Sequence, residues 1–99
     1  MFTKTRFDSL ELPEHLMNAI TAMGWECLTE VQRDTIPLAR SGRDVIGQAR
    51  TGSGKTAAFG LPLLELLDFS QNYPQALILC PTRELCLQIT NDLKNYAKN

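Results

Sequence analysis

The glycine-rich stretch 45–56 holds the residues of this chain best suited to chemistry. It reads Val45-Ile46-Gly47-Gln48-Ala49-Arg50-Thr51-Gly52-Ser53-Gly54-Lys55-Thr56. An apolar run, then a glycine-rich loop, then a helix-forming segment is the order that a phosphate-binding loop requires. Gly52 and Gly54 can adopt positive φ, so successive backbone N–H groups can form a nest for an anion. The following helix N-terminus adds the positive end of its dipole. The alternative is a chance glycine turn before a helix.

Lys55 and Thr56 provide the side-chain chemistry of this loop. The Lys55 ammonium can reach the β- and γ-phosphates of a nucleotide, where it would act in catalysis, and the Thr56 hydroxyl can ligate Mg²⁺. Ala49 stands where the general pattern has its first glycine, and its small side chain keeps most of the required room. The stretch therefore predicts that the chain binds nucleotide phosphates.

The composition is that of an ordinary soluble globular protein. The chain has 99 residues, of which 43% are hydrophobic and 21% charged, so one domain or part of one is expected. Its net charge of −1 provides no global basic field, and any contact with nucleic acid must be local. No apolar run reaches membrane-spanning length and no signal-peptide pattern opens the chain, so no membrane partner is expected.

The cysteine pattern argues against a disulfide framework or a zinc site. The three cysteines, Cys27, Cys80 and Cys86, form an odd count without CxxC spacing. Each lies among apolar residues, so buried, reduced thiols are expected. Reduced thiols indicate an intracellular compartment, and whether it is cytoplasmic or nuclear stays open.

The first 42 residues predict an irregular arm over residues 2–12 and then two helices. Pro13 suits the first position of a helix and Gly24 suits its end. Its buried face is marked by apolar residues at spacings of four and three, namely Leu16, Ile20 and Met23. Thr29 and Gln32 have the spacing of a capping box that starts the second helix.

Residues 43–99 predict a β-α-β-α unit. A strand opens the stretch 45–56, a helix covers 55–67, a strand covers 76–80, and a last helix begins near residue 83. The second strand has no polar alternation, which predicts burial on both faces. The apolar stripe of the helix at 55–67 is assigned to Phe59, Leu63, Leu66 and Leu67. Right-handed crossovers between parallel strands give an α/β class, a three-layer sandwich around a parallel sheet.

Three stretches, in this order, resemble motifs of the DEAD-box RNA helicases. Thr29 and Gln32 resemble the Q motif, residues 49–56 resemble motif I, and Pro81-Thr82-Arg83-Glu84-Leu85 resembles motif Ia. Phe7 lies upstream at about the distance of the family's isolated aromatic residue. The resemblance implies a P-loop NTPase of RecA-like fold, incomplete in this chain.

The resemblance also implies an ATP site with Mg²⁺ held by Thr56. Gln32 would hold the adenine edge through N6 and N7, or its amide would instead serve the capping box with Thr29. Phe7 would stack on adenine, or would simply pack onto the domain. Leu28 departs from the family, which usually has proline there. The implied ATP-binding residues are Phe7, Gln32, Ala49, Arg50, Thr51, Gly52, Ser53, Gly54, Lys55 and Thr56.

A contact with the RNA backbone is implied for Pro81, Thr82 and Arg83, and backbone contacts carry no base specificity. The alternative for Arg83 is a solvated arginine at a helix start. The family's Asp-Glu-Ala-Asp carboxylates, its Ser-Ala-Thr motif and its second RecA-like domain are not in the sequence.

We therefore expect the N-terminal part of a first RecA-like domain over residues 1–99, with a Q-motif region at 1–42 and the P-loop unit at 43–99. Such a part would be inactive without the remainder of the helicase. Two other hypotheses stay open at this stage. One is another P-loop nucleic-acid-dependent ATPase, such as a DNA motor. The other is a stand-alone nucleotide-binding module without hydrolysis.

Overall fold

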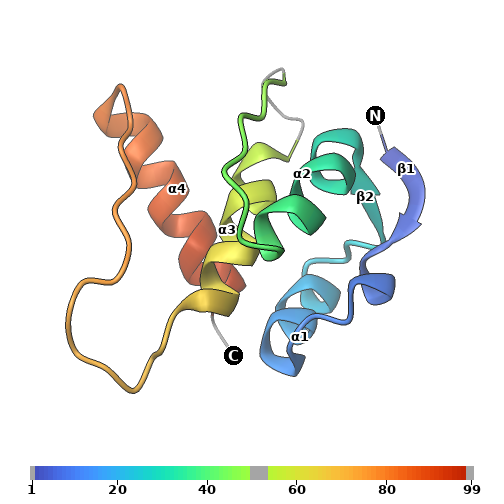
Figure 1. The fold of residues 1–99 in the computed structure, drawn as a ribbon, viewed down its shortest axis with the longest axis horizontal. Coiled ribbons are helices and arrows are strands. Elements are labelled where there is room, and N and C mark those ends of the chain that lie inside the picture. Colours follow the sequence, from blue (N-terminus) through green and yellow to red (C-terminus); the bar gives the residue numbers. More distant parts are fainter. Residues whose placement is uncertain (1, 50–53, 98–99) are drawn as a thin grey trace.

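The computed structural model describes residues 2–49 and 54–97 (Figure 1). Helix α3 lies in the middle, with α4 on one side and α2 on the other. A small sheet and helix α1 complete the side on which α2 lies. In chain order the elements are β1 (Phe2–Arg6), the 3-10 helix η1 (Phe7–Leu10), α1 (Glu14–Ala22), β2 (Cys27–Thr29), α2 (Glu30–Arg40), α3 (Lys55–Leu66) and α4 (Arg83–Tyr96).

The N-terminal arm is regular, so the prediction of an irregular segment at 2–12 was wrong. Strand β1 pairs antiparallel with β2, with Phe2 opposite Thr29 and Arg6 opposite Cys27. The Thr3 hydroxyl donates to the Leu28 carbonyl at 2.9 Å, which ties the two strands together on one face. Half-buried and exposed residues alternate along β1, but its sequence has no apolar alternation that would predict a strand, and its partner strand has only three residues.

The two strands predicted for a parallel sheet are absent from the described part of the chain. Residues 45–49 and 76–80 belong to no strand, and the only sheet assigned among residues 2–49 and 54–97 is the β1–β2 pair. None of their side chains is fully buried, and the most exposed apolar ones are Ile46 at 99% and Leu77 and Leu79 at 84% each. A strand needs a neighbour to satisfy its N–H and C=O groups, and the described chain places none beside either segment.

The helix boundaries follow the local signals that predicted them. Gly24 adopts a φ of 76° just after α1, and its N–H donates to the Thr21 carbonyl. The capping box at the start of α2 is formed by Thr29 and Gln32. Gly42 adopts a φ of 86° just after that helix ends.

Helix α3 buries a face other than the predicted one. The predicted stripe includes Phe59 and Leu66, which are 37% and 74% exposed. Its buried residues are Ala57, Ala58, Gly60, Leu61, Pro62 and Leu64. Because apolar residues occur on both sides of this helix, periodicity alone could not decide which face is buried. Gly60 lets α4 approach closely, since a Cβ there would lie 2.7 Å from Leu93 Cδ2.

An ion pair and an aromatic row connect the elements around the core. Arg40 Nε lies 3.0 Å from Glu65 Oε1 and joins α2 to α3. Trp25 stacks on Phe7 at a centroid distance of 5.8 Å and lies 5.7 Å from the ring of Tyr96 in α4. The fully buried aliphatic side chains of the core are Leu16, Ile20, Leu28, Ile36 and Leu61. None of the helices in the described ranges combines the length and the hydropathy needed to cross a bilayer.

The three cysteines are free thiols, as expected, but none of them is fully buried. Cys27 and Cys80 are half-buried, while Cys86 is exposed on α4. Cys86 follows Leu85, and one residue along a helix turns the side chain by about 100°, away from the apolar stripe. The prediction of burial was therefore wrong for Cys86.

Candidate nucleotide-binding site

The candidate phosphate loop ends at the first turn of α3. Gly54 adopts φ 85° and ψ 25°, a left-handed conformation that favours glycine, and it occupies the N-cap position of α3. A glycine at this position offers no side chain to cap the helix. Four of the predicted ATP-binding residues, Arg50, Thr51, Gly52 and Ser53, lie outside the described residues.

The start of α3 differs from the starts of the other α-helices in its charge. Helices α1, α2 and α4 carry Glu14, Glu30 and Glu84 in their first turns, where a carboxylate compensates the helix dipole. The first turn of α3 has no acidic residue and begins with Lys55. Its positive end is therefore left to an anion from outside the helix.

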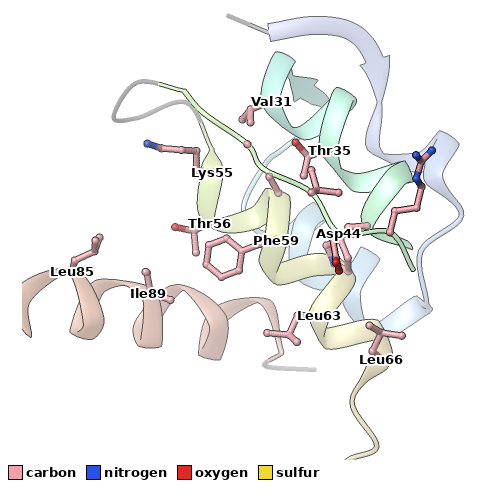
Figure 2. A pocket seen from close by; sticks show the side chains of 16 residues that line it. Val31, Thr35, Asp44, Lys55, Thr56, Phe59, Leu63, Leu66, Leu85 and Ile89 are labelled. Atoms are coloured by element: carbon pink, nitrogen blue, oxygen red, sulfur yellow. The ribbon is translucent and has the colours of Figure 1, made fainter. Parts of the chain in front are cut away.

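Lys55 crosses the base of the loop. Its Nζ donates a hydrogen bond of 2.6 Å to the carbonyl of Ala49, at the other described end of the loop, and this contact is exposed. Figure 2 shows the Lys55 side chain extending away from α3, while Thr56 follows it on the helix. Among the described residues, the exposed bond to the Ala49 carbonyl is the one hydrogen bond that holds the ammonium.

Gln32 joins the start of α2 to the start of α3. Its Oε1 accepts from the Thr29 N–H at 2.9 Å, and the Gln32 N–H is 3.4 Å from Thr29 Oγ1. Its Nε2 donates to the Gly54 carbonyl at 3.2 Å. The capping-box alternative is therefore observed, and the bond to Gly54 was not foreseen. The contact with adenine stays a prediction.

Phe7 lies in the core and is 2% exposed. Its ring stacks on Trp25 with an interplanar angle of 28°. This is the packing alternative, and stacking on adenine stays a prediction. Phe7 and Trp25 border a cavity of about 370 Å³ whose rim carries the charged residues Arg6, Asp8 and Glu26.

A groove of about 670 Å³ runs between α2, α3, α4 and residues 43–47 (Figure 2). Lys55 and Thr56 line part of it, and Leu85 and Ile89 of α4 face them across the groove. Most of its walls are apolar, including Phe59 and Leu63, so the groove suits packing and not phosphate binding.

The predicted RNA-binding residues lie at the start of α4. The Thr82 hydroxyl accepts a hydrogen bond of 3.1 Å from the Leu85 N–H and so caps the helix. Pro81, Thr82 and Arg83 are all exposed. The Thr82 cap is as the sequence predicted, and the contact of these three residues with RNA stays a prediction.

Comparison with known proteins identifies the family of this chain. The model of the DEAD/DEAH box helicase family matches residues 29–99. The chain belongs to this family. The chain is 48% identical over 89 residues to the ATP-dependent RNA helicase CshA of Listeria monocytogenes, covering 90% of this chain and 17% of that protein. It is 44% identical over 98 residues to the ATP-dependent RNA helicase DeaD of Haemophilus influenzae, covering 99% and 16%.

Solved structures of DEAD-box proteins share the fold of this chain. A DEAD box protein from Methanococcus jannaschii superposes with a TM-score of 0.87 at 39% identity, covering 98% of this chain and 26% of that one. S. cerevisiae Dbp5 bound to RNA and ADP BeF3 superposes with a TM-score of 0.89 at 35% identity, covering 97% and 25%. The α/β, RecA-like class is therefore confirmed. The chain spans about a quarter of these structures and about a sixth of the curated relatives.

The contact between Gln32 and Gly54 can be tested with two glycine variants. Gly42→Ala and Gly54→Ala both place a side chain at positive φ, at φ 86° and 85° respectively, which costs about 1 kcal/mol. At Gly42 a Cβ meets nothing within 4 Å, whereas at Gly54 it would collide with Nε2 of Gln32. We expect Gly54→Ala to lower the free energy of unfolding by about 1–3 kcal/mol more than Gly42→Ala, because the buried Gln32 amide loses its partner. Urea unfolding without nucleotide measures this difference.

The same contact predicts a non-additive double variant. Combining Gly54→Ala with Gln32→Ala should cost less than the sum of the two single losses, because both remove one interaction. Equal losses for Gly42→Ala and Gly54→Ala, or strict additivity of the double variant, would contradict the contact.

Proposed function

We propose that this chain is the N-terminal part of the first RecA-like domain of an ATP-dependent RNA helicase, and that residues 49–56 bind the phosphates of ATP. The observation that carries the proposal is the start of α3. There, a left-handed Gly54 and a helix dipole without its own carboxylate lie beside Lys55, whose ammonium is bonded to the neutral Ala49 carbonyl. The relatives are named ATP-dependent RNA helicases, which supports ATP as the nucleotide.

The proposed exchange at Lys55 is simple. An incoming phosphate would replace the neutral Ala49 carbonyl as the acceptor of the ammonium, and a charge-assisted hydrogen bond is stronger than a neutral one. The N–H groups at the start of α3 would complete the cradle for the same phosphate.

Adenine would be held by Gln32 in this proposal. Both polar atoms of its amide are engaged, Oε1 by Thr29 and Nε2 by Gly54. A base that pairs with the amide must replace at least one of these bonds, so adenine recognition would be coupled to the position of Gly54. Phe7 would need to expose a ring face to stack on the base, because its ring is 2% exposed and packs on Trp25.

Thr56 would be a ligand of Mg²⁺. Its side chain is half-buried and follows Lys55 at the start of α3. The described ranges contain no group of three His, Cys, Asp or Glu residues that could hold a metal ion by themselves. Such a site fits Mg²⁺, which is commonly held by few protein ligands together with substrate phosphates and water. The bound ion would neutralise phosphate charge, and the chain's own part would be to position one hydroxyl.

RNA would be bound through its backbone at Pro81, Thr82 and Arg83. The exposed Arg83 guanidinium offers several donors to one phosphate, while the Thr82 cap holds the turn in place. Hydrolysis needs an acidic residue that orients water and groups that neutralise the transition state, and the remainder of the helicase would supply them. We therefore propose that the 99 residues bind without turnover.

Lys55→Ala in the intact helicase should weaken ATP binding by about ten- to a hundredfold, because a hydrogen bond to a charged group contributes about 1.5–3 kcal/mol. Isothermal calorimetry of Lys55→Ala against Lys94→Ala measures this directly. The control removes an equal charge from the exposed side of α4. If Lys55→Ala and Lys94→Ala both bind ATP as tightly as the unmodified protein, the proposed phosphate site is refuted.

Gln32→Ala should lower ATP affinity and reduce the preference for ATP over GTP, because the amide that pairs with the adenine edge is lost. Thr29→Ala is the matched control, since it removes the helix cap at a cost of about 1 kcal/mol while keeping the amide. Competition binding of ATP and GTP compares the two. If both variants lose stability and neither changes the nucleotide preference, Gln32 serves the capping box alone.

Arg83→Ala should weaken RNA binding to a similar degree for unrelated sequences and should flatten the dependence of log K on log salt by less than about one unit. The reason is that one phosphate contact fewer releases fewer counterions. Fluorescence anisotropy over a salt series provides the slope, with Arg33→Ala as a variant of equal charge change on α2. A slope that is the same for both variants places Arg83 outside the RNA path.

A further inference from the structure

A single arginine side chain joins three elements of the fold. Arg40 is the last residue of α2, and its Nη1 donates a hydrogen bond to the carbonyl of Leu10, the last residue of η1. Its Nε lies 3.0 Å from Oε1 of Glu65, which is in the last turn of α3. Because two different nitrogens of one planar guanidinium make these contacts, η1, α2 and α3 are held in a fixed relation at this point.

Glu65 depends on this partner. A carboxylate in the last turn of a helix lies at the negative end of the helix dipole, so α3 itself does not stabilise the charge of Glu65. Its Oε1 is buried and accepts no hydrogen bond within the described ranges, and the side chain is 18% exposed. The charge of Arg40 therefore compensates it. The Arg33–Asp34 pair differs, since it joins neighbours on α2 and is exposed.

The Arg40–Glu65 pair lies at the opposite end of α2 and α3 from the Gln32–Gly54 bond. That bond joins the starts of the two helices and the ion pair joins their ends, so the helices lie side by side and run in the same direction (Figure 1). At 1.5 Å per residue, the two links are about 12 Å apart along α2 and about 16 Å apart along α3. One link alone would act as a pivot, whereas two separated links fix both the tilt and the axial position of α3 on α2.

We propose that Arg40 is a positioning residue for the ATP site, which holds the base-binding elements η1 and α2 at a fixed distance from the phosphate-binding start of α3. The inference rests on the proposed function, in which Phe7 and Gln32 contact adenine and Lys55 contacts phosphate. Arg40 lies at the other end of α2 from Gln32, so it acts through these elements and not on the nucleotide.

The effect of such a bridge depends on whether a ligand spans both parts of the site. A spanning ligand gains affinity when the two parts are held at the right separation, because its second contact then requires little further ordering. ATP spans both parts, whereas inorganic tripolyphosphate uses the phosphate part alone. Loss of Arg40 should therefore weaken the binding of ATP and leave that of tripolyphosphate unchanged. A purely structural role would weaken both ligands alike, since a loosened domain also loses the phosphate part.

The test is displacement of a fluorescent ATP analogue from the intact helicase by ATP or by tripolyphosphate, both with Mg²⁺. We expect Arg40→Met to weaken ATP about three- to tenfold and tripolyphosphate by less than about twofold. Arg33→Met is the matched control, because it removes an equal charge from the exposed side of α2, and it should change neither affinity. Ile36→Val removes one buried carbon from the same helix and leaves the bridge intact, so it should keep the ratio of the two affinities.

Glu65→Gln tests the same bridge from α3, in case Arg40→Met folds poorly. Glutamine keeps the shape of the side chain and an acceptor for Arg40 but loses the charge. We therefore expect a smaller loss of ATP affinity, again without a change for tripolyphosphate. Circular dichroism and urea unfolding of each variant measure the fold separately from binding.

Two results would overturn the inference. One is an ATP affinity of Arg40→Met and Glu65→Gln equal to that of the unmodified protein. The other is equal weakening of ATP and tripolyphosphate, which indicates a structural role alone. Lys55→Ala, measured alongside, distinguishes either result from failure of the proposed function. If Lys55→Ala weakens both ligands, the phosphate site stands whatever the result at Arg40, and if it weakens neither, the proposed phosphate site is refuted and this inference with it.

Discussion

The side-chain amide of Gln32 connects the starts of two helices that are far apart in the sequence. It accepts from the Thr29 N–H and donates to the Gly54 carbonyl, a residue 22 positions away. The side chain is 3% exposed, so water cannot replace either partner. Because Gly54 is the N-cap of α3, this amide sets where the helix begins and where the phosphate loop closes.

The same amide makes the proposed site responsive to its ligand. A base that pairs with Gln32 has to displace Thr29 or Gly54, and a phosphate that binds Lys55 has to displace Ala49. Both exchanges occur at the ends of one loop. Where the base displaces Gly54, occupancy of the base position and geometry of the phosphate position would therefore be linked through backbone contacts.

Two sets of apolar residues are exposed because the described chain forms no parallel sheet that would bury them. Phe59 and Leu66 lie on the exposed face of α3, while Ile46, Leu77 and Leu79 lie in segments without strand pairing. In a three-layer sandwich, the helix face and the strands would bury each other. The related structures are about four times as long as this chain, and an interior strand of a parallel sheet bonds its backbone to a neighbour on each side.

The sequence alone determined the local features of this protein: the helix starts at Thr29 and Thr82, the helix-ending glycine Gly24, and the motifs that indicate the family. These features depend on contacts within a few residues, which spacing and residue type specify. Only the tertiary structure decided which face of α3 is buried, that β1 pairs with β2, and that Gln32 bonds to Gly54. Those outcomes depend on contacts between distant segments, and neither periodicity nor capping signals encode which distant segment will be the partner.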